Sequence, residues 1–155
     1  MKPLGFAVSL RDSNETRKES VVSTRSRVGL LTETDQVKSI YVHFDGYVEE
    51  PGVGAKLHKH WRNTGRVAEL LDLGDLSQLG EILGQEHDFD AHDSSTNWCL
   101  AYGRDRGETD VDAVIHGVDE WPDYGQEYEY LFDPRSGSWS YRKAWPERGP
   151  WTPLS

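Results

Sequence analysis

The spacing of apolar residues predicts two β-hairpins, one in each half of the chain. Residues 27–32 and 37–44 are rich in β-branched and apolar side chains and are joined by a short polar turn. Residues 127–132 and 138–142 flank Asp133-Pro-Arg-Ser-Gly137, which strongly favours a turn. Both patterns are typical of paired antiparallel strands. Three further strands are predicted, over 98–102, over 111–118 and over Phe6–Leu10.

Apolar side chains at intervals of three and four residues predict three short helices between the hairpins. The first runs from Val53 to Trp61, and the second starts after an N-cap at Asn63 and ends at Gly74. A third is predicted between Gly74 and Gly84. We therefore expect an α+β fold, in which a mostly antiparallel sheet of two hairpins plus extra strands carries a short-helix insert packed on one face.

The chain is expected to form one domain over residues 24–143. Its 155 residues are enough to bury a core. Residues 1–23 are predicted to be an N-terminal extension, and residues 144–155 a Pro-rich tail that packs through Trp145 and Trp151. The apolar runs are all shorter than the roughly 20 residues that cross a bilayer, so no membrane association is expected.

Negative charge is concentrated in the second half of the chain. The formal net charge is −10, and residues 81–133 hold fifteen Asp and Glu against two Arg. Such a surface repels nucleic acids and anionic membranes. It suits a basic partner or a divalent metal, or it serves only solubility. The single Cys99 excludes an internal disulfide and fits a reducing cytosol.

The second strand of the first hairpin ends in candidate site residues. Period-two alternation places His43, Asp45 and Tyr47 on one face. A histidine beside a carboxylate can act as a general base or bind a metal. The alternative is a hydrogen-bonded strand face without chemistry.

A second cluster combines histidines and aspartates in one acidic loop. His87, Asp88, Asp90 and His92 are candidate metal ligands, because carboxylates bind hard cations and imidazoles accept zinc or manganese. Their spacing matches no known metal-binding motif. A solvated acidic loop is the alternative.

Arginines supply the third candidate site. Arg104, Asp105 and Arg106 follow Tyr102 in a predicted charged loop, and Arg27 lies in the first hairpin. Guanidinium groups bind phosphates and carboxylates through paired hydrogen bonds. The loop is thus either a phosphate pocket or a segment fastened by internal Arg–carboxylate pairs.

Several motifs together resemble a family of small proteins carried by bacteriophages and prophages. These motifs are Thr24-Arg-Ser-Arg-Val-Gly29, Ile40-Tyr-Val-His-Phe-Asp-Gly-Tyr47, Leu73-Gly-Asp-Leu-Ser-Gln-Leu-Gly80, Ala101-Tyr-Gly-Arg-Asp-Arg-Gly-Glu108 and Tyr130-Leu-Phe-Asp133. The resemblance implies a phage setting, and hence the cytoplasm of a bacterial host, but no established activity. The chain departs from the family pattern at Val48–Gly52 and at His87–Ala91.

Three functions follow as hypotheses. The first is a non-enzymatic phage inhibitor that docks on a basic host protein by imitating the charge of nucleic acid, without binding nucleic acid itself. The second is a binder that sequesters a nucleotide-type signal through Tyr41, Tyr47, Tyr102, Arg104 and Arg106. The third is a metal-dependent hydrolase built on His43, Asp45 and the His87–Asp93 loop. No cofactor is expected, because no complete catalytic or phosphate-binding motif occurs, and self-association is left open.

Overall fold

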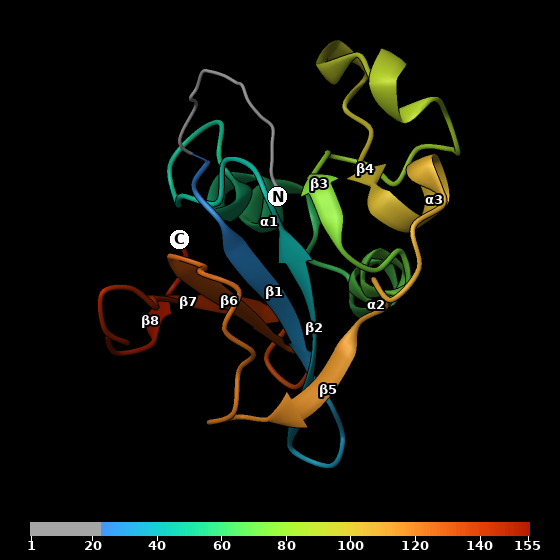
Figure 1. The fold of residues 1–155 in the computed structure, drawn as a ribbon. Helices are drawn as coiled ribbons and strands as arrows, with labels where there is room; N and C mark the ends of the chain where they lie inside the picture. Colours follow the sequence, from blue (N-terminus) through green and yellow to red (C-terminus); the bar gives the residue numbers. More distant parts are fainter. Residues whose placement is uncertain (1–22) are drawn as a thin grey trace.

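In the computed structural model of the protein, the structure of residues 23–155 is described (Figure 1). It has the predicted α+β class: one mixed sheet of eight strands and three short helices. The strands are β1 Ser26–Leu31, β2 Gln36–Val42, β3 Leu76–Gln78, β4 Leu100–Ala101, β5 Val114–Gly117, β6 Tyr128–Asp133, β7 Ser138–Lys143 and β8 Thr152–Pro153. The helices are α1 Val53–His60, α2 Thr64–Asp72 and α3 Tyr102–Arg106, with single 3₁₀ turns η1 Phe89–Ala91 and η2 Ser94–Thr96.

Strand β1 lies in the middle of the sheet. It pairs antiparallel with β2 and parallel with β6, and the full order is β4-β3-β2-β1-β6-β7-β8, with β5 pairing β2 as well. Strand β6 pairs antiparallel with β7. The parallel pairs β1–β6 and β2–β3 make the sheet mixed, which local patterns do not reveal because the paired strands are distant in sequence.

Helices α1 and α2 pack on one face of the sheet, behind it in Figure 1. Val28, Ile40 and Val42 point from the sheet into this core, where they meet Leu57 and Leu70 of the helices. The predicted N-cap of α2 is present, since the Asn63 side chain accepts a hydrogen bond from the Arg66 amide. The core therefore follows the helical and strand periodicities of the sequence.

The prediction of a third helix before Gly84 is wrong. Residues Leu76–Gln78 form β3, which lies parallel to the end of β2 and antiparallel to β4. The amides of His43 and Phe44 donate to the carbonyls of Leu76 and Ser77, at 3.0 Å each. Pairing with strands distant in sequence thus overrides the helical spacing of the leucines.

Two further segments differ from expectation. The predicted charged loop after Tyr102 begins as the helical turn α3. The tail adds β8 to the edge strand β7 and buries Leu154, whose amide donates to the Trp139 carbonyl at 3.0 Å. Trp145 does not pack as predicted, because 62% of it is exposed.

The strand predicted at Phe6–Leu10 and nearly all of the predicted extension 1–23 lie outside the described residues. Within residues 23–155, none of the helices has the length and apolar character that crossing a bilayer requires.

Candidate functional site

Arg104 and Asp105 form an internal anchor. The Arg104 guanidinium donates to Asp105 Oδ1 at 2.9 Å and to the carbonyls of Leu83 and Cys99 at 2.8 Å each. The fully buried Asp105 carboxylate also accepts from the amides of Ala101, at 2.8 Å, and His87, at 3.2 Å. Burial opposes ionisation, but these hydrogen bonds outweigh it and lower the pKa of Asp105. The Arg104–Asp105 pair thus links the start of α3 to Leu83, to His87 and to the chain at Cys99–Ala101.

Arg106 is also engaged within the protein. Its guanidinium carbon lies 4.3 Å from the centre of the Phe89 ring and 5.0 Å from that of Tyr102, and Nε donates to Glu108 at 2.6 Å. The two rings stack with centres 5.6 Å apart. Burial raises the pKa of Tyr102 to about 12. These contacts pack η1 against α3, so Tyr102 and Arg106 stabilise the fold at this point.

His43, Asp45 and Tyr47 do not share a strand face, as the alternation predicted. Strand β2 ends at Val42, and Asp45 adopts a left-handed φ of 59°. His43 Nδ1 lies 2.7 Å from the Tyr41 hydroxyl, and burial, helped by Arg25, lowers the pKa of His43 to about 4. The Tyr41 hydroxyl therefore donates to a neutral imidazole.

The predicted site residues also fail to meet in one cavity. Asp45 lines a cavity of about 410 Å³ together with His60, Glu81, His92 and other polar residues. His43, Tyr47 and Arg104 are absent from its lining. Of the ligand-binding residues expected from the sequence, Tyr41, Tyr102 and Arg106 are also absent from this lining.

Three of the four metal candidates make hydrogen bonds within their own loop. Asp88 accepts from the Asp90 amide at 3.0 Å, and His87 Nε2 lies 2.8 Å from His92 Nδ1. Throughout residues 23–155, no group of three or more His, Cys, Asp or Glu side chains is placed to hold a metal ion.

A buried polar cluster, which the sequence did not predict as a unit, lies on the sheet face opposite the helices. Arg27 of β1 is 0% exposed; its Nε donates to Ser39 Oγ and its Nη2 to the Ser39 carbonyl, each at 3.1 Å. Ser39 Oγ lies 2.8 Å from His116 Nε2, and His116 Nδ1 lies 2.8 Å from the Gly117 carbonyl. A carbonyl only accepts, and burial lowers the pKa of His116, so Nδ1 carries the proton and Ser39 donates to Nε2.

Glu129 is the buried carboxylate of this cluster. It lies opposite Arg27 in the β1–β6 pair but accepts instead from Arg142 at 2.8 Å, from Arg148 at 2.9 Å and from Gln126 at 2.9 Å. Burial raises its pKa, yet the hydrogen bonds from Arg148, Gln126 and Arg142 bring it below the usual range. Glu129 is therefore ionised and fully paired.

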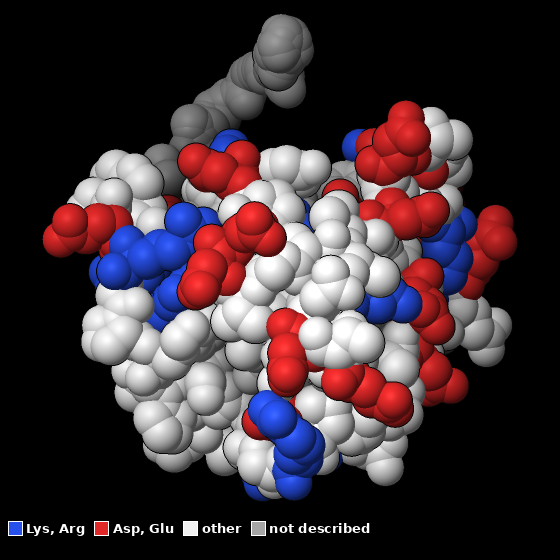
Figure 2. Space-filling view, turned by 90° about the horizontal axis from the view of Figure 1, so that it is seen from below, with Lys and Arg blue, Asp and Glu red and all other residues white. Residues whose placement is uncertain are grey.

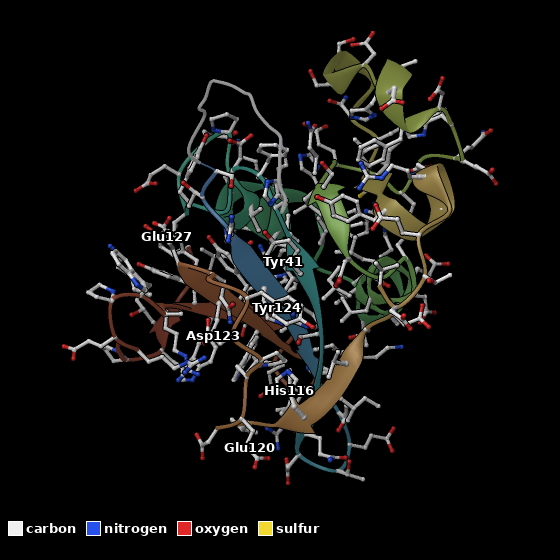
Figure 3. All side chains as sticks on the ribbon, viewed as in Figure 1. Tyr41, His116, Glu120, Asp123, Tyr124 and Glu127 are labelled. Atoms are coloured by element: carbon white, nitrogen blue, oxygen red, sulfur yellow. The ribbon has the colours of Figure 1, made fainter. Side chains whose placement is uncertain are left out.

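The Tyr124 ring covers Arg27 from the solvent side. The Arg27 guanidinium carbon lies 5.1 Å from the centre of this ring, and the ring of Tyr41 lies 5.9 Å from it. Figure 3 shows Tyr41 and Tyr124 together in front of the sheet, with His116 below them. The alternation of side chains along β2 places Ser39 and Tyr41 on the same face of the sheet. His116 and Tyr124 come from other segments, so no pattern within β2 could predict that they join this cluster.

Exposed acidic residues flank strand β5 at both of its ends, and Lys38 of β2 lies opposite Ile115. Residues 107–134 contain no Lys or Arg. Asp110 and Asp112 precede β5, Asp119 and Glu120 follow it, and all four are exposed. Figure 2 views the molecule from the end where β5 lies in Figure 1 and shows groups of acidic side chains there, with smaller groups of Lys and Arg between them.

No protein-family model matches the chain, and no curated protein or solved structure is significantly similar to it. The resemblance to phage-borne proteins therefore stays a prediction.

Proposed function

We propose that the protein is a non-enzymatic binding protein that docks on a basic protein through the surface around β5. The observation that carries this proposal is an exposed apolar strand inside an acidic frame. Ile115 is 60% exposed and Val114 is 38% exposed. Among the described strands, β5 pairs with β2 alone, so its other edge carries no strand.

An apolar centre with a charged rim suits recognition of a protein. Apolar contacts supply affinity at the centre, while complementary rim charges steer the encounter and select the partner. An open strand edge also accepts an extended segment of another chain. The frame of Asp110, Asp112, Asp119 and Glu120 favours Lys and Arg in that segment.

The internal use of the predicted site residues supports a binding role over a catalytic one. The Arg104 guanidinium is held by one carboxylate and two carbonyls, and His43 is held by Tyr41. The Ser39–His116 pair has the hydrogen bond of a nucleophile and its base, but Ser39 is 0% exposed. The groups that stay available on the surface are mainly exposed carboxylates, which suit binding.

The resemblance to phage-borne proteins provides the biological setting of the proposal. In that setting the partner is a basic host protein that normally binds nucleic acid, and the acidic surface occupies its groove as an inhibitor. The encounter takes place in the bacterial cytoplasm. Direct binding of nucleic acid is disfavoured by the net charge of −10.

Capture from a bacterial lysate on the immobilised protein tests this function. We expect partners with a basic surface that double-stranded DNA displaces. Reversing two charges beside β5, in Asp112→Lys with Asp119→Lys, should weaken binding of the purified partner about tenfold or more, since like charges then meet. Glu86→Lys with Glu147→Lys makes the same change in net charge at exposed positions outside the surface around β5 and should have little effect. Capture of nothing, or of partners insensitive to both DNA and the β5 variant, contradicts the proposal.

A further inference from the structure

Arg27 has an unused hydrogen-bonding edge. Its Nη1 atom is buried and has no hydrogen-bond partner, a condition shared in residues 23–155 only by Ser26 Oγ. A guanidinium carries five N–H donors and stays charged in proteins. Leaving part of a buried cation without an acceptor is costly, so the Nη1 edge calls for a ligand or for a compensating role.

No carboxylate in the described residues makes a hydrogen bond to Arg27. Arg27 and Arg142 are both largely buried, and Arg148 is partly exposed, while Glu129 is the single fully buried carboxylate beside them. Asp75 is nearby, but its Oδ1 accepts from the Tyr41 amide at 2.9 Å. Since Glu129 is shared by Arg142 and Arg148, Arg27 has no carboxylate in hydrogen-bond contact. A bound anion would supply the acceptor that Arg27 Nη1 lacks.

The Tyr124 side chain covers the Arg27 guanidinium, and hydrogen bonds fix the loop that carries it. The Tyr124 ring is 51% exposed. Behind it, Gln126 Oε1 accepts a hydrogen bond from the Tyr124 amide at 2.8 Å. Gln126 Nε2 donates to the Pro122 carbonyl at 2.6 Å and to the Glu129 carboxylate at 2.9 Å. Trp121 Nε1 donates to the Val118 carbonyl at 2.9 Å. The ring can therefore turn about its own bonds without unfolding the loop.

We propose that Arg27 binds a phosphate-type oxyanion through Nη1 when the Tyr124 ring turns aside. Phosphate oxygens match the planar fork of a guanidinium. Arg25 adds a second cation at the mouth, because it is exposed and its Nη1 lies 3.5 Å from the Tyr124 carbonyl. The neighbouring ring of Tyr41 offers a flat surface for a planar group attached to the phosphate. This site is separate from the β5 surface, so its failure would leave the proposed function standing.

Calorimetric titration with inorganic phosphate and with AMP, each against chloride at equal ionic strength, tests the site. We expect saturable binding of both phosphates and none of chloride. Tighter binding of AMP would identify a nucleotide as the preferred source, and equal binding would identify the phosphate group alone; either outcome supports the site.

Variants of Tyr124 and Arg27 separate the site from unspecific attraction. If the ring stands open about one-tenth of the time, Tyr124→Ala should bind phosphate about tenfold more tightly, while Tyr124→Phe keeps the cover and should bind like wild type. Arg27→Met should abolish binding. If that variant does not fold, Arg27→Lys, which keeps the charge but loses the fork, should bind more weakly than wild type. The proposal is overturned if neither wild type nor Tyr124→Ala binds phosphate, or if binding persists unchanged without the Arg27 guanidinium.

Discussion

At the scale of single residues, the buried carboxylates each accept hydrogen bonds from several donors. Asp105 accepts hydrogen bonds from Arg104 and from the amides of Ala101 and His87. Glu129 accepts from two arginines and a glutamine. These carboxylates sit where the chain must join distant segments, so their removal should affect stability more than any surface charge.

Asp105→Ala should lower the free energy of unfolding by about 3 kcal/mol, because it leaves the Arg104 guanidinium without its carboxylate and two amides without their acceptor. The matched change Asp112→Ala, at an exposed position, should change it by about 0.5 kcal/mol or less. Urea denaturation of both variants measures the difference. Equal stability of the two would mean that the Arg104–Asp105 pair does not fasten the loop.

His43 should make stability depend on pH. Its pKa falls from 6.5 to about 4 on folding, so the unfolded chain binds more protons between these values. The stabilisation is complete above pH 6.5 and is lost as the pH falls to about 4, by up to about 3 kcal/mol. His43→Gln should reduce this slope, with the remainder due to His92 and His116, whose pKa values are also lowered. An NMR titration of His43 with a midpoint near 6.5 would refute the assignment.

At the scale of elements, the segment after Gly74 shows how contacts decide between two local patterns. Its leucines have helical spacing, yet Leu76–Gln78 joins the sheet, and the chain then turns at Gly84 with a φ of +71°. The Trp98 side chain packs directly against Gly84, so a methyl group there would overlap the indole. The turn and the packing both require glycine.

Gly84→Ala should destabilise the protein by about 3 kcal/mol, through backbone strain and overlap with Trp98. Gly137 has a comparable φ of +66°, but nothing lies within 4 Å of an added methyl group. Gly137→Ala should therefore cost only the strain, about 1 kcal/mol. Guanidinium denaturation of the pair isolates the packing contribution, and equal losses would contradict the contact with Trp98.

At the scale of the whole molecule, the sheet has different surroundings on its two faces. The helices and an apolar core cover one face, and the loop with Trp121 and Tyr124 covers the charged cluster on the other. The last residues complete the sheet edge through β8 and contribute Leu154 to the core. The expected Pro-rich tail is thus part of the folded unit in residues 23–155.

Leu154→Ala should lower the free energy of unfolding by about 2 kcal/mol, because it empties a buried position. Thr152→Ala, at an exposed position of β8, is the matched control and should be near neutral. Thermal unfolding followed by circular dichroism compares them. Wild-type stability of Leu154→Ala would show that the tail does not dock.

Apolar periodicity and turn residues correctly predicted those helices, strands and turns whose conformation is set by their own sequence. The strands around Val28 and Ile40, the helix starting at Thr64 and the turn before Gly137 all agree with the structure. The site was less predictable. Arg27, Tyr102 and Arg104 were nominated as binding residues, but whether each guanidinium or ring is free depends on acceptors and neighbours elsewhere in the chain.

The sequence by itself determined the α+β class, the acidic character of the second half and the identity of the charged residues, because periodicity, turn chemistry and composition are local properties. Only the tertiary structure decided which of those charges remain available. It brought the carbonyl of Leu83 to Arg104 and gave Glu129 to Arg142 and Arg148, leaving the edge of Arg27 without an acceptor. The physical reason is that a buried charge must find its partner across the fold, and strand pairing sets which partners come within reach.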